Sequence, residues 1–299
     1  MKIAVIGTTF VDIKGYPVGK FDPAGRNAGR VETFHGGVGR NIAEDVRSLG
    51  ADTVFVSLVD RSALAEEVLA HLNRRGINTE YVGKSKDGMG TWLAIFDDKG
   101  DVYANVSRRT NLLPMADIIR EHGEEIFKDA DGVLVEIDMD EPVIEEIFRQ
   151  AEKYGSDVYA VISNMNVGLE RAAYINRCRC LVCNQHEAGI FFGKDTDALT
   201  PGQMLDFLKA SMEKSPLEKI VVTAGGEGCI YVSDDESGIC PAVPANVVDT
   251  TGAGDSFFAG CSVGLSSGMS LRDAAALGNR IASVVIGSIA NVCADWIKS

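Results

Sequence analysis

The sequence predicts an α/β protein with a doubly wound, mostly parallel sheet and a small β-sheet lid. Short apolar runs, beginning with residues 2–6, alternate along the chain with segments of helical spacing. This alternation is typical of a parallel sheet with right-handed crossovers. Two β-rich segments, about 13–36 and 88–107, interrupt it and are interpreted as the lid, with edge strands of the main sheet as the alternative. We expect a single domain over residues 1–299.

The expected elements follow one another in chain order. The first strand ends at Gly7 and is followed by a turn over Gly7–Asp12. Later strands and helices alternate, and Asp98–Asp101 indicates a hairpin inside the second lid segment. The expected strands cover 53–59, 131–137, 157–163, 178–184, 220–223 and 243–248, and the clearest helices cover 63–74 and 141–153.

The composition is that of a globular enzyme and argues against a nucleic-acid-binding or membrane-spanning protein. A hydrophobic content of 45% and 24% charged residues are ordinary for a globular enzyme. A net charge of −14 argues against nucleic acid as a bulk partner, because phosphate backbones need a basic surface. The first ten residues lack the pattern of a signal peptide, and residues 281–290 are too short an apolar run to span a bilayer. Seven cysteines without an export signal indicate a reducing cytoplasm.

The most informative stretch is Asp249–Asp255, which reads DTTGAGD. The expected strand over 243–248 leads into it, and helical spacing follows it, so the turn opens a helix whose free N–H groups can bind an anion. A carboxylate at Asp255 would repel a phosphate, which argues that it takes a proton from an attacking hydroxyl. The alternative is an ordinary helix N-terminus.

A second glycine-rich turn, Gly36–Gly39, also opens a helix. Gly37 would let a small polar ligand approach the backbone, and Asn41 in the first turns can donate and accept hydrogen bonds with hydroxyls. Asp12 follows the first strand, where ligands sit in open α/β sheets. It is a candidate for holding substrate hydroxyls or, equally, a turn residue.

Two further loops follow expected strands. Asn184 and Glu187 stand three residues apart after one strand, where oxygen ligands suit Mg²⁺ held through water and where a helix cap is the alternative. The loop from Thr223 to Gly228 follows another strand and contains three glycines. By itself this loop could equally be the turn of a hairpin.

Asp249–Asp255 resembles the C-terminal signature of the PfkB/ribokinase family of sugar and nucleoside kinases, and His35–Ala43 resembles its N-terminal signature. The resemblance implies a ribokinase-like fold and transfer of the γ-phosphoryl group of ATP to a primary hydroxyl. It implies that Asp255 is the general base. It also implies four further sets of residues, which bind the transferred anion, the substrate, Mg²⁺ and the nucleotide. These sets are Gly252, Ala253 and Gly254 for the anion; Asp12, Gly37 and Asn41 for substrate; Asn184 and Glu187 for the metal; and Asn184, Thr223, Gly225, Gly228 and Asn279 for the nucleotide.

Val38 and Arg40 inside the first signature are similar to the pseudouridine-kinase branch of that family, whereas Ser163–Asn166 departs from its pattern. We therefore expect a nucleoside kinase that prefers pseudouridine. The alternatives are a free-sugar kinase of ribokinase or fructokinase type and a non-catalytic sugar or nucleoside sensor. The family also implies a possible K⁺ ion near the anion site and a homodimer formed through the lid.

Overall fold

The computed structural model describes residues 1–98 and 102–293, and it confirms the expected fold class. A nine-stranded sheet has the order β13-β12-β11-β10-β9-β8-β1-β4-β5, and every strand runs in the same direction except β12, which is antiparallel to both of its neighbours. The strands are β1 (Lys2–Ile6), β4 (Asp52–Val59), β5 (Val82–Lys84), β8 (Gly132–Glu136), β9 (Val158–Val161), β10 (Cys180–Asn184), β11 (Lys219–Thr223), β12 (Cys229–Ser233) and β13 (Ser237–Cys240).

Helices cover both faces of this sheet. Successive residues of a strand point to opposite faces, and because both sets of side chains are apolar, both faces need a covering layer. On β1, Ile3 and Val5 join one core while Ala4 and Ile6 join the other. The first face carries α1 (Val38–Ser48), α2 (Ala63–Arg74), α10 (Ala253–Ser266) and α11 (Leu271–Ile286). The second carries α3 (Pro114–Glu121), α4 (Gly123–Phe127), α5 (Glu141–Tyr154), α6 (Met165–Glu170), α7 (Ala172–Ile175), α8 (Gln185–Phe192) and α9 (Pro201–Met212).

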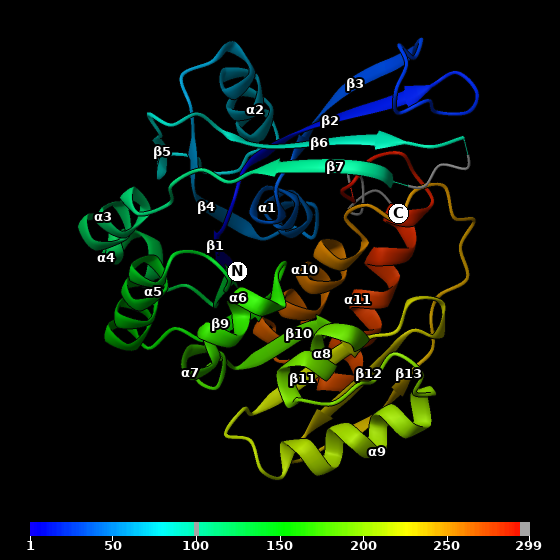
Figure 1. Ribbon diagram of the computed structural model, residues 1–299. Coiled ribbons are helices and arrows are strands. Elements are labelled where there is room, and N and C mark those ends of the chain that lie inside the picture. Colours follow the sequence, from blue (N-terminus) through cyan, green and yellow to red (C-terminus); the bar gives the residue numbers. More distant parts are fainter. Residues whose placement is uncertain (99–101, 294–299) are drawn as a thin grey trace.

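The two interrupting segments form a separate four-stranded sheet with the order β3-β2-β6-β7. Figure 1 shows this lid sheet lying across the top of the main domain. Its strands are β2 (Phe10–Pro17), β3 (Gly29–Gly36), β6 (Gly90–Phe96) and β7 (Val102–Arg108). The alternative of edge strands on the main sheet is therefore wrong. Residues 99–101 of the predicted hairpin turn lie outside the described residues, although β6 and β7 do pair antiparallel.

The lid sheet exposes several apolar side chains. Val31 and Val106 are 73% and 70% exposed, and Leu93, Val102 and Tyr103 are also exposed. A second subunit could cover these apolar side chains. The homodimer through the lid stays a prediction. No helix within 1–98 and 102–293 is long and apolar enough to cross a membrane.

The expected strand over residues 243–248 is wrong. The chain there has no strand pairing, and Val247 and Val248 are exposed. Pro241 and Pro244 lack the N–H groups that a further edge strand would need, and the Val248 N–H donates to the Ile286 carbonyl at the end of α11 instead. The turn before α10 is therefore reached from an extended loop.

Two glycines bring the start of α1 against the end of β1. A Cβ added at Gly39 would lie 2.5 Å from the carbonyl carbon of Gly7, and one at Gly7 would lie 2.8 Å from the Cα of Gly39. Because both neighbours are backbone atoms, neither position has room for a side chain. The contact fixes where the second glycine turn sits above the sheet.

We predict that Gly39→Ala lowers the free energy of unfolding by about 1–3 kcal/mol, as overpacking of a tight site does. Gly202→Ala is the matched control, since Gly202 is also the second residue of its helix and a Cβ there meets nothing within 4 Å. That control should be neutral or slightly stabilising. Urea unfolding of both variants measures the difference, and equal stabilities would contradict the tight contact.

Candidate active site

The turn before α10 presents backbone donors at the start of a 14-residue helix. Gly252 is the N-cap and has a φ of 81°, and a Cβ there would lie 2.1 Å from the Asn291 carbonyl oxygen, so only glycine fits. The Ala253 N–H donates to the Thr250 carbonyl. The N–H groups of Gly252 and Gly254 have no acceptor among the described residues, which leaves two donors for an anion.

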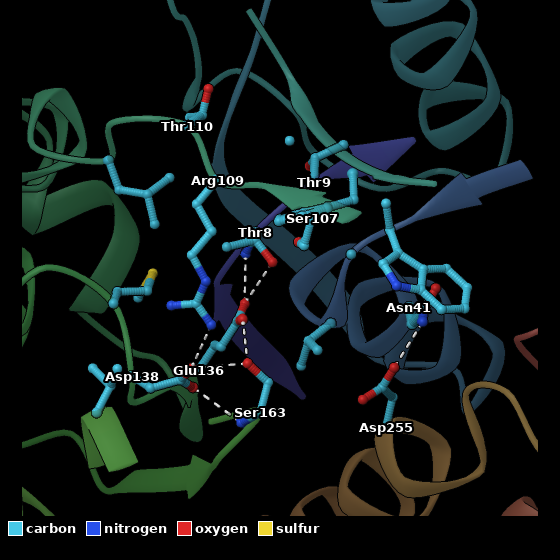
Figure 2. Close-up of a pocket in the computed structure, with 18 of the residues that line it drawn as sticks. Thr8, Thr9, Asn41, Ser107, Arg109, Thr110, Glu136, Asp138, Ser163 and Asp255 are labelled. Atoms are coloured by element: carbon cyan, nitrogen blue, oxygen red, sulfur yellow. Dashed lines mark hydrogen bonds and ion pairs between the residues drawn. The ribbon is translucent and has the colours of Figure 1, made fainter. Parts of the chain in front are cut away.

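Asp255 lies in the first turn of α10 and meets Asn41 from the first turn of α1. Asn41 Nδ2 donates to Asp255 Oδ2 at 2.7 Å, as Figure 2 shows. The other amide atom, Asn41 Oδ1, is buried and has no partner among the described residues. The fold thus brings together two predicted site residues that are 214 positions apart in the sequence. Asn41 Oδ1 remains as an acceptor for a hydroxyl.

Burial raises the pKa of Asp255 from 3.8 to about 6. The hydrogen bond from Asn41 and the positive charge of Arg40 lower this pKa, whereas the Asp12 carboxylate adds to the rise. Asp255 is therefore ionised near neutral pH and basic enough to accept a proton there. A general base works best when its pKa lies near the working pH.

Asp12 lies inside strand β2, where it pairs with Phe34 and Trp92, so its placement in a turn was wrong. The turn is confined to residues 7–9 because β2 begins at Phe10 and runs into the lid. The Asp12 side chain lies against Gly36, and its carboxylate accepts no hydrogen bond from the described residues. Burial raises its pKa. This carboxylate is free to accept hydrogen bonds from substrate hydroxyls.

A second polar group, which the sequence analysis missed, follows strands β1, β8 and β9. The N–H and hydroxyl of Thr8 both donate to Glu136 Oε2 at 2.8 Å, and Ser163 Oγ donates to Asp138 Oδ2 at 2.8 Å. The pKa of Glu136 rises to about 7, because the group is buried and lies near Asp138. The available signal was the run of acids Glu136, Asp138 and Asp140 directly after a buried strand.

These residues line one cavity of about 610 Å³ between the main sheet and the lid. Figure 2 shows Asn41 and Asp255 on one side of it and Arg109, Asp138 and Ser163 on the other. Of the predicted site residues, the cavity lining contains Asp12, Gly37, Asn41, Gly252 and Asp255. The volume lies within the range of about 300–1,000 Å³ that small-molecule sites have.

Asn184 and Glu187 form a capping box at the start of α8 and do not line this cavity. Asn184 Oδ1 accepts the Glu187 N–H, and Glu187 Oε2 accepts the Asn184 N–H. One Glu187 oxygen remains, and burial raises the pKa of this carboxyl. No cluster of three metal-binding side chains occurs among the described residues. The free Glu187 oxygen can accept a hydrogen bond from a water on Mg²⁺, and the Mg²⁺ site stays a prediction.

The remaining predicted nucleotide residues gather around the carboxyl end of β11, farther along the same edge of the main sheet. Thr223 ends β11, and Gly225 and Gly228 flank a 3₁₀ turn with φ values of 54° and 95°. Asn279 is buried in α11 and donates to the Cys240 and Pro241 carbonyls, so its amide holds the end of β13. None of these four residues lines the cavity with Asp255.

Comparisons with known proteins agree with this geometry. Residues 1–292 match the family model described as pfkB family carbohydrate kinase. A guanosine-inosine kinase of Exiguobacterium acetylicum is 30% identical over 97% of this chain and 96% of its own. A pseudouridine kinase of Escherichia coli is 27% identical over 86% of this chain and 82% of its own.

A solved structure of ribokinase from Giardia lamblia superimposes with a TM-score of 0.83 at 20% identity, covering 97% of this chain and 94% of that one. This likeness supports the ribokinase-like arrangement of the sheet and the lid. The family model covers both glycine turns and nearly the whole chain. The protein is therefore a kinase that belongs to the pfkB family of carbohydrate kinases.

Proposed function

We propose that this kinase transfers the γ-phosphoryl group of ATP to the primary hydroxyl of a nucleoside. The observation that carries the proposal is the half-buried Asp255 carboxylate, hydrogen-bonded to Asn41 at 2.7 Å beside the unpaired N–H groups that open α10. A base next to an anion site is what phosphoryl transfer to a hydroxyl requires.

The chain's own residues divide the work. Asp12 and Asn41 accept and donate hydrogen bonds with the ribose hydroxyls, which places the primary hydroxyl at Asp255. Asp255 takes its proton as that oxygen bonds to the γ-phosphorus and the bond from phosphorus to the ADP oxygen breaks. The N–H groups of Gly252 and Gly254 stabilise the charge on the transferred group. When bound, Mg²⁺ neutralises phosphate charge, with Asn184 and Glu187 in its outer surroundings.

The nucleotide side is proposed to be Thr223, Gly225 and Gly228, whose backbone follows β11 as the loop near the phosphates does in the family. Asn279 supports that side by holding the Cys240–Pro241 carbonyls. K⁺ near the anion site remains an expectation from the family.

The charge of the cavity favours a neutral acceptor. Its lining contains five carboxylates and two guanidinium groups, namely Asp12, Glu136, Asp138, Asp140 and Asp255 against Arg109 and Arg171. A sugar phosphate or a sugar acid would add negative charge to this excess, and like charges at close range disfavour binding. Nucleosides and free sugars have no such cost.

The extent of the cavity favours a nucleoside over a free sugar. Beyond the expected ribose contacts it continues to Arg109 and Asp138, on the side opposite Asp255 (Figure 2). The relatives that act on nucleosides are named for guanosine, inosine and pseudouridine. Pseudouridine remains the prediction from the glycine signature, and guanosine and inosine join it as candidates.

We predict that Asp255→Asn lowers kcat by about 10²–10⁴-fold, the usual contribution of a general base. Because the amide keeps an oxygen that can accept from Asn41, the affinity for substrate and the unfolding free energy should change little. Steady-state kinetics, calorimetric binding and urea unfolding separate these effects. Full activity in this variant would show that another group takes the proton.

The pH profile gives an independent test of the base. Since the raised pKa of Asp255 is about 6 and only the ionised form accepts a proton, kcat/KM should fall about tenfold per unit below that pH. Asp12, Asp45, Glu136 and Arg40 are the charged groups that act on or face Asp255. Glu136→Gln should keep the acidic limb if Asp255 causes it. A limb that disappears in Glu136→Gln would assign it to Glu136.

The acceptor is identified by an assay of ATP conversion to ADP with Mg²⁺, with and without K⁺. Pseudouridine, uridine, guanosine, inosine, ribose and fructose form the panel, and we expect at least one nucleoside to exceed both free sugars in kcat/KM. The reason is that only a nucleoside fills the part of the cavity next to Arg109. Turnover confined to ribose or fructose would replace the proposal with a free-sugar kinase.

A further inference from the structure

Arg109 and Arg171 are the two guanidinium groups of the cavity lining. Arg171 donates to the Met139 carbonyl and pairs with Glu141 and Glu170, whereas Arg109 reaches the cavity from the lid. It directly follows lid strand β7, and its side chain is 52% exposed. Its Nη2 lies 3.2 Å from Asp138 Oδ2, the one hydrogen bond recorded for its guanidinium among the described residues. A guanidinium carries five N–H donors and no acceptor. Several donors therefore remain for a ligand in the cavity that Arg109 lines.

The buried Asp138 carboxylate binds the Arg109 guanidinium. The Asp138 side chain is only 1% exposed. Oδ1 accepts the Ser163 N–H at 3.0 Å, and Oδ2 accepts the Ser163 hydroxyl at 2.8 Å as well as Arg109. Figure 2 shows Arg109 descending from the lid to this carboxylate, opposite Asn41 and Asp255. Asp138 and Ser163 thus orient the guanidinium, and the guanidinium is the group that a substrate meets.

The surroundings fit a flat, neutral group. Trp92 from lid strand β6 and Val167 from α6 line the same cavity and supply apolar surface. The excess of carboxylates in the lining disfavours an anion at Arg109. A carbonyl oxygen is the neutral acceptor that a guanidinium recognises well, as it does in paired bonds to O6 and N7 of guanine.

We propose that Arg109, held by Asp138, selects nucleosides whose base carries a carbonyl oxygen where adenine and cytosine carry an amino group. The substrate class is then 6-oxopurine and 4-oxopyrimidine nucleosides. An amino group would direct its own donors at the guanidinium and leave both unpaired, which is how a polar site rejects the wrong analogue. The inference rests on the proposed nucleoside kinase function, since it needs the ribose to be held at Asp12 and Asn41.

Inosine and adenosine make the test sharp, because they differ chiefly in the oxygen or amino group at C6. For the natural protein, kcat/KM for inosine should exceed that for adenosine by about 10–100-fold. Arg109→Met should reduce this ratio to within about threefold, mainly by loss of inosine activity. Arg109→Lys should retain part of the ratio, because an ammonium donates without the planar fork.

Arg108→Met is the matched control. Arg108 precedes Arg109, donates to the Met89 carbonyl and does not line the cavity. It should keep the full preference for inosine. If Arg109→Met and Arg108→Met lower the turnover of all substrates equally, Arg109 only fastens the lid and the inference is wrong. Should Arg109→Met fail to fold, Arg109→Lys replaces it, with a lowered but not abolished preference for inosine as the expected result.

The outcomes separate this inference from the function on which it rests. Turnover of both nucleosides with no preference for inosine overturns the role of Arg109 and leaves the nucleoside kinase in place. Absence of turnover with every nucleoside, alongside activity on ribose, overturns the proposed function and this inference together. A preference for inosine that depends on Arg109 and not on Arg108 supports both.

Discussion

The hydrogen bond between Asn41 and Asp255 joins the two helices on which the proposed chemistry depends. Each helix begins at a turn in which one glycine has no room for a side chain, namely Gly39 against Gly7 in α1 and Gly252 against Asn291 before α10. Both helices pack on the same face of the sheet. The carboxylate is therefore fixed by backbone contacts in two places, which reduces the reorganisation needed when a proton is transferred.

The order of the strands supplies the rest of the site. β1 lies between β8 and β4, so the chain reverses direction across the sheet at β1, and ligands bind outside the carboxyl ends of strands at such a point. Thr8 after β1 and Glu136 at the end of β8 are joined there by two hydrogen bonds. The lid sheet, reached directly from β1 through β2, closes the opposite side of the cavity.

The sequence predicted the features that short segments determine, such as helix bounds and turns. The bounds of α2 agree with the sequence in full, and both glycine turns open helices, because spacing and backbone freedom are properties of short segments. The strand expected over 243–248 failed because Pro241 and Pro244 lack the N–H groups that pairing needs, and because the Val248 N–H donates to the Ile286 carbonyl, a distant contact that no local pattern reveals. The contacts of Ser163 and Arg109 with Asp138 were not predicted for the same reason. They form only because the end of β9 and the lid both approach Asp138 in the folded protein.

Asp12, Glu136 and Asp255 line the cavity and have raised pKa values, and a comparison of Glu136 with Asp255 favours Asp255 as the base. Burial raises the pKa of both. Asp255 receives an N–H donor from Asn41 and feels the charge of Arg40, which both favour its ionised form. Glu136 accepts two hydrogen bonds from Thr8, which lower its pKa, but burial and the neighbouring Asp138 outweigh them. Groups whose environments push their pKa values apart take different roles. Glu136 therefore holds a proton more readily than Asp255 does, and a protonated Glu136 adds no negative charge near an incoming phosphate.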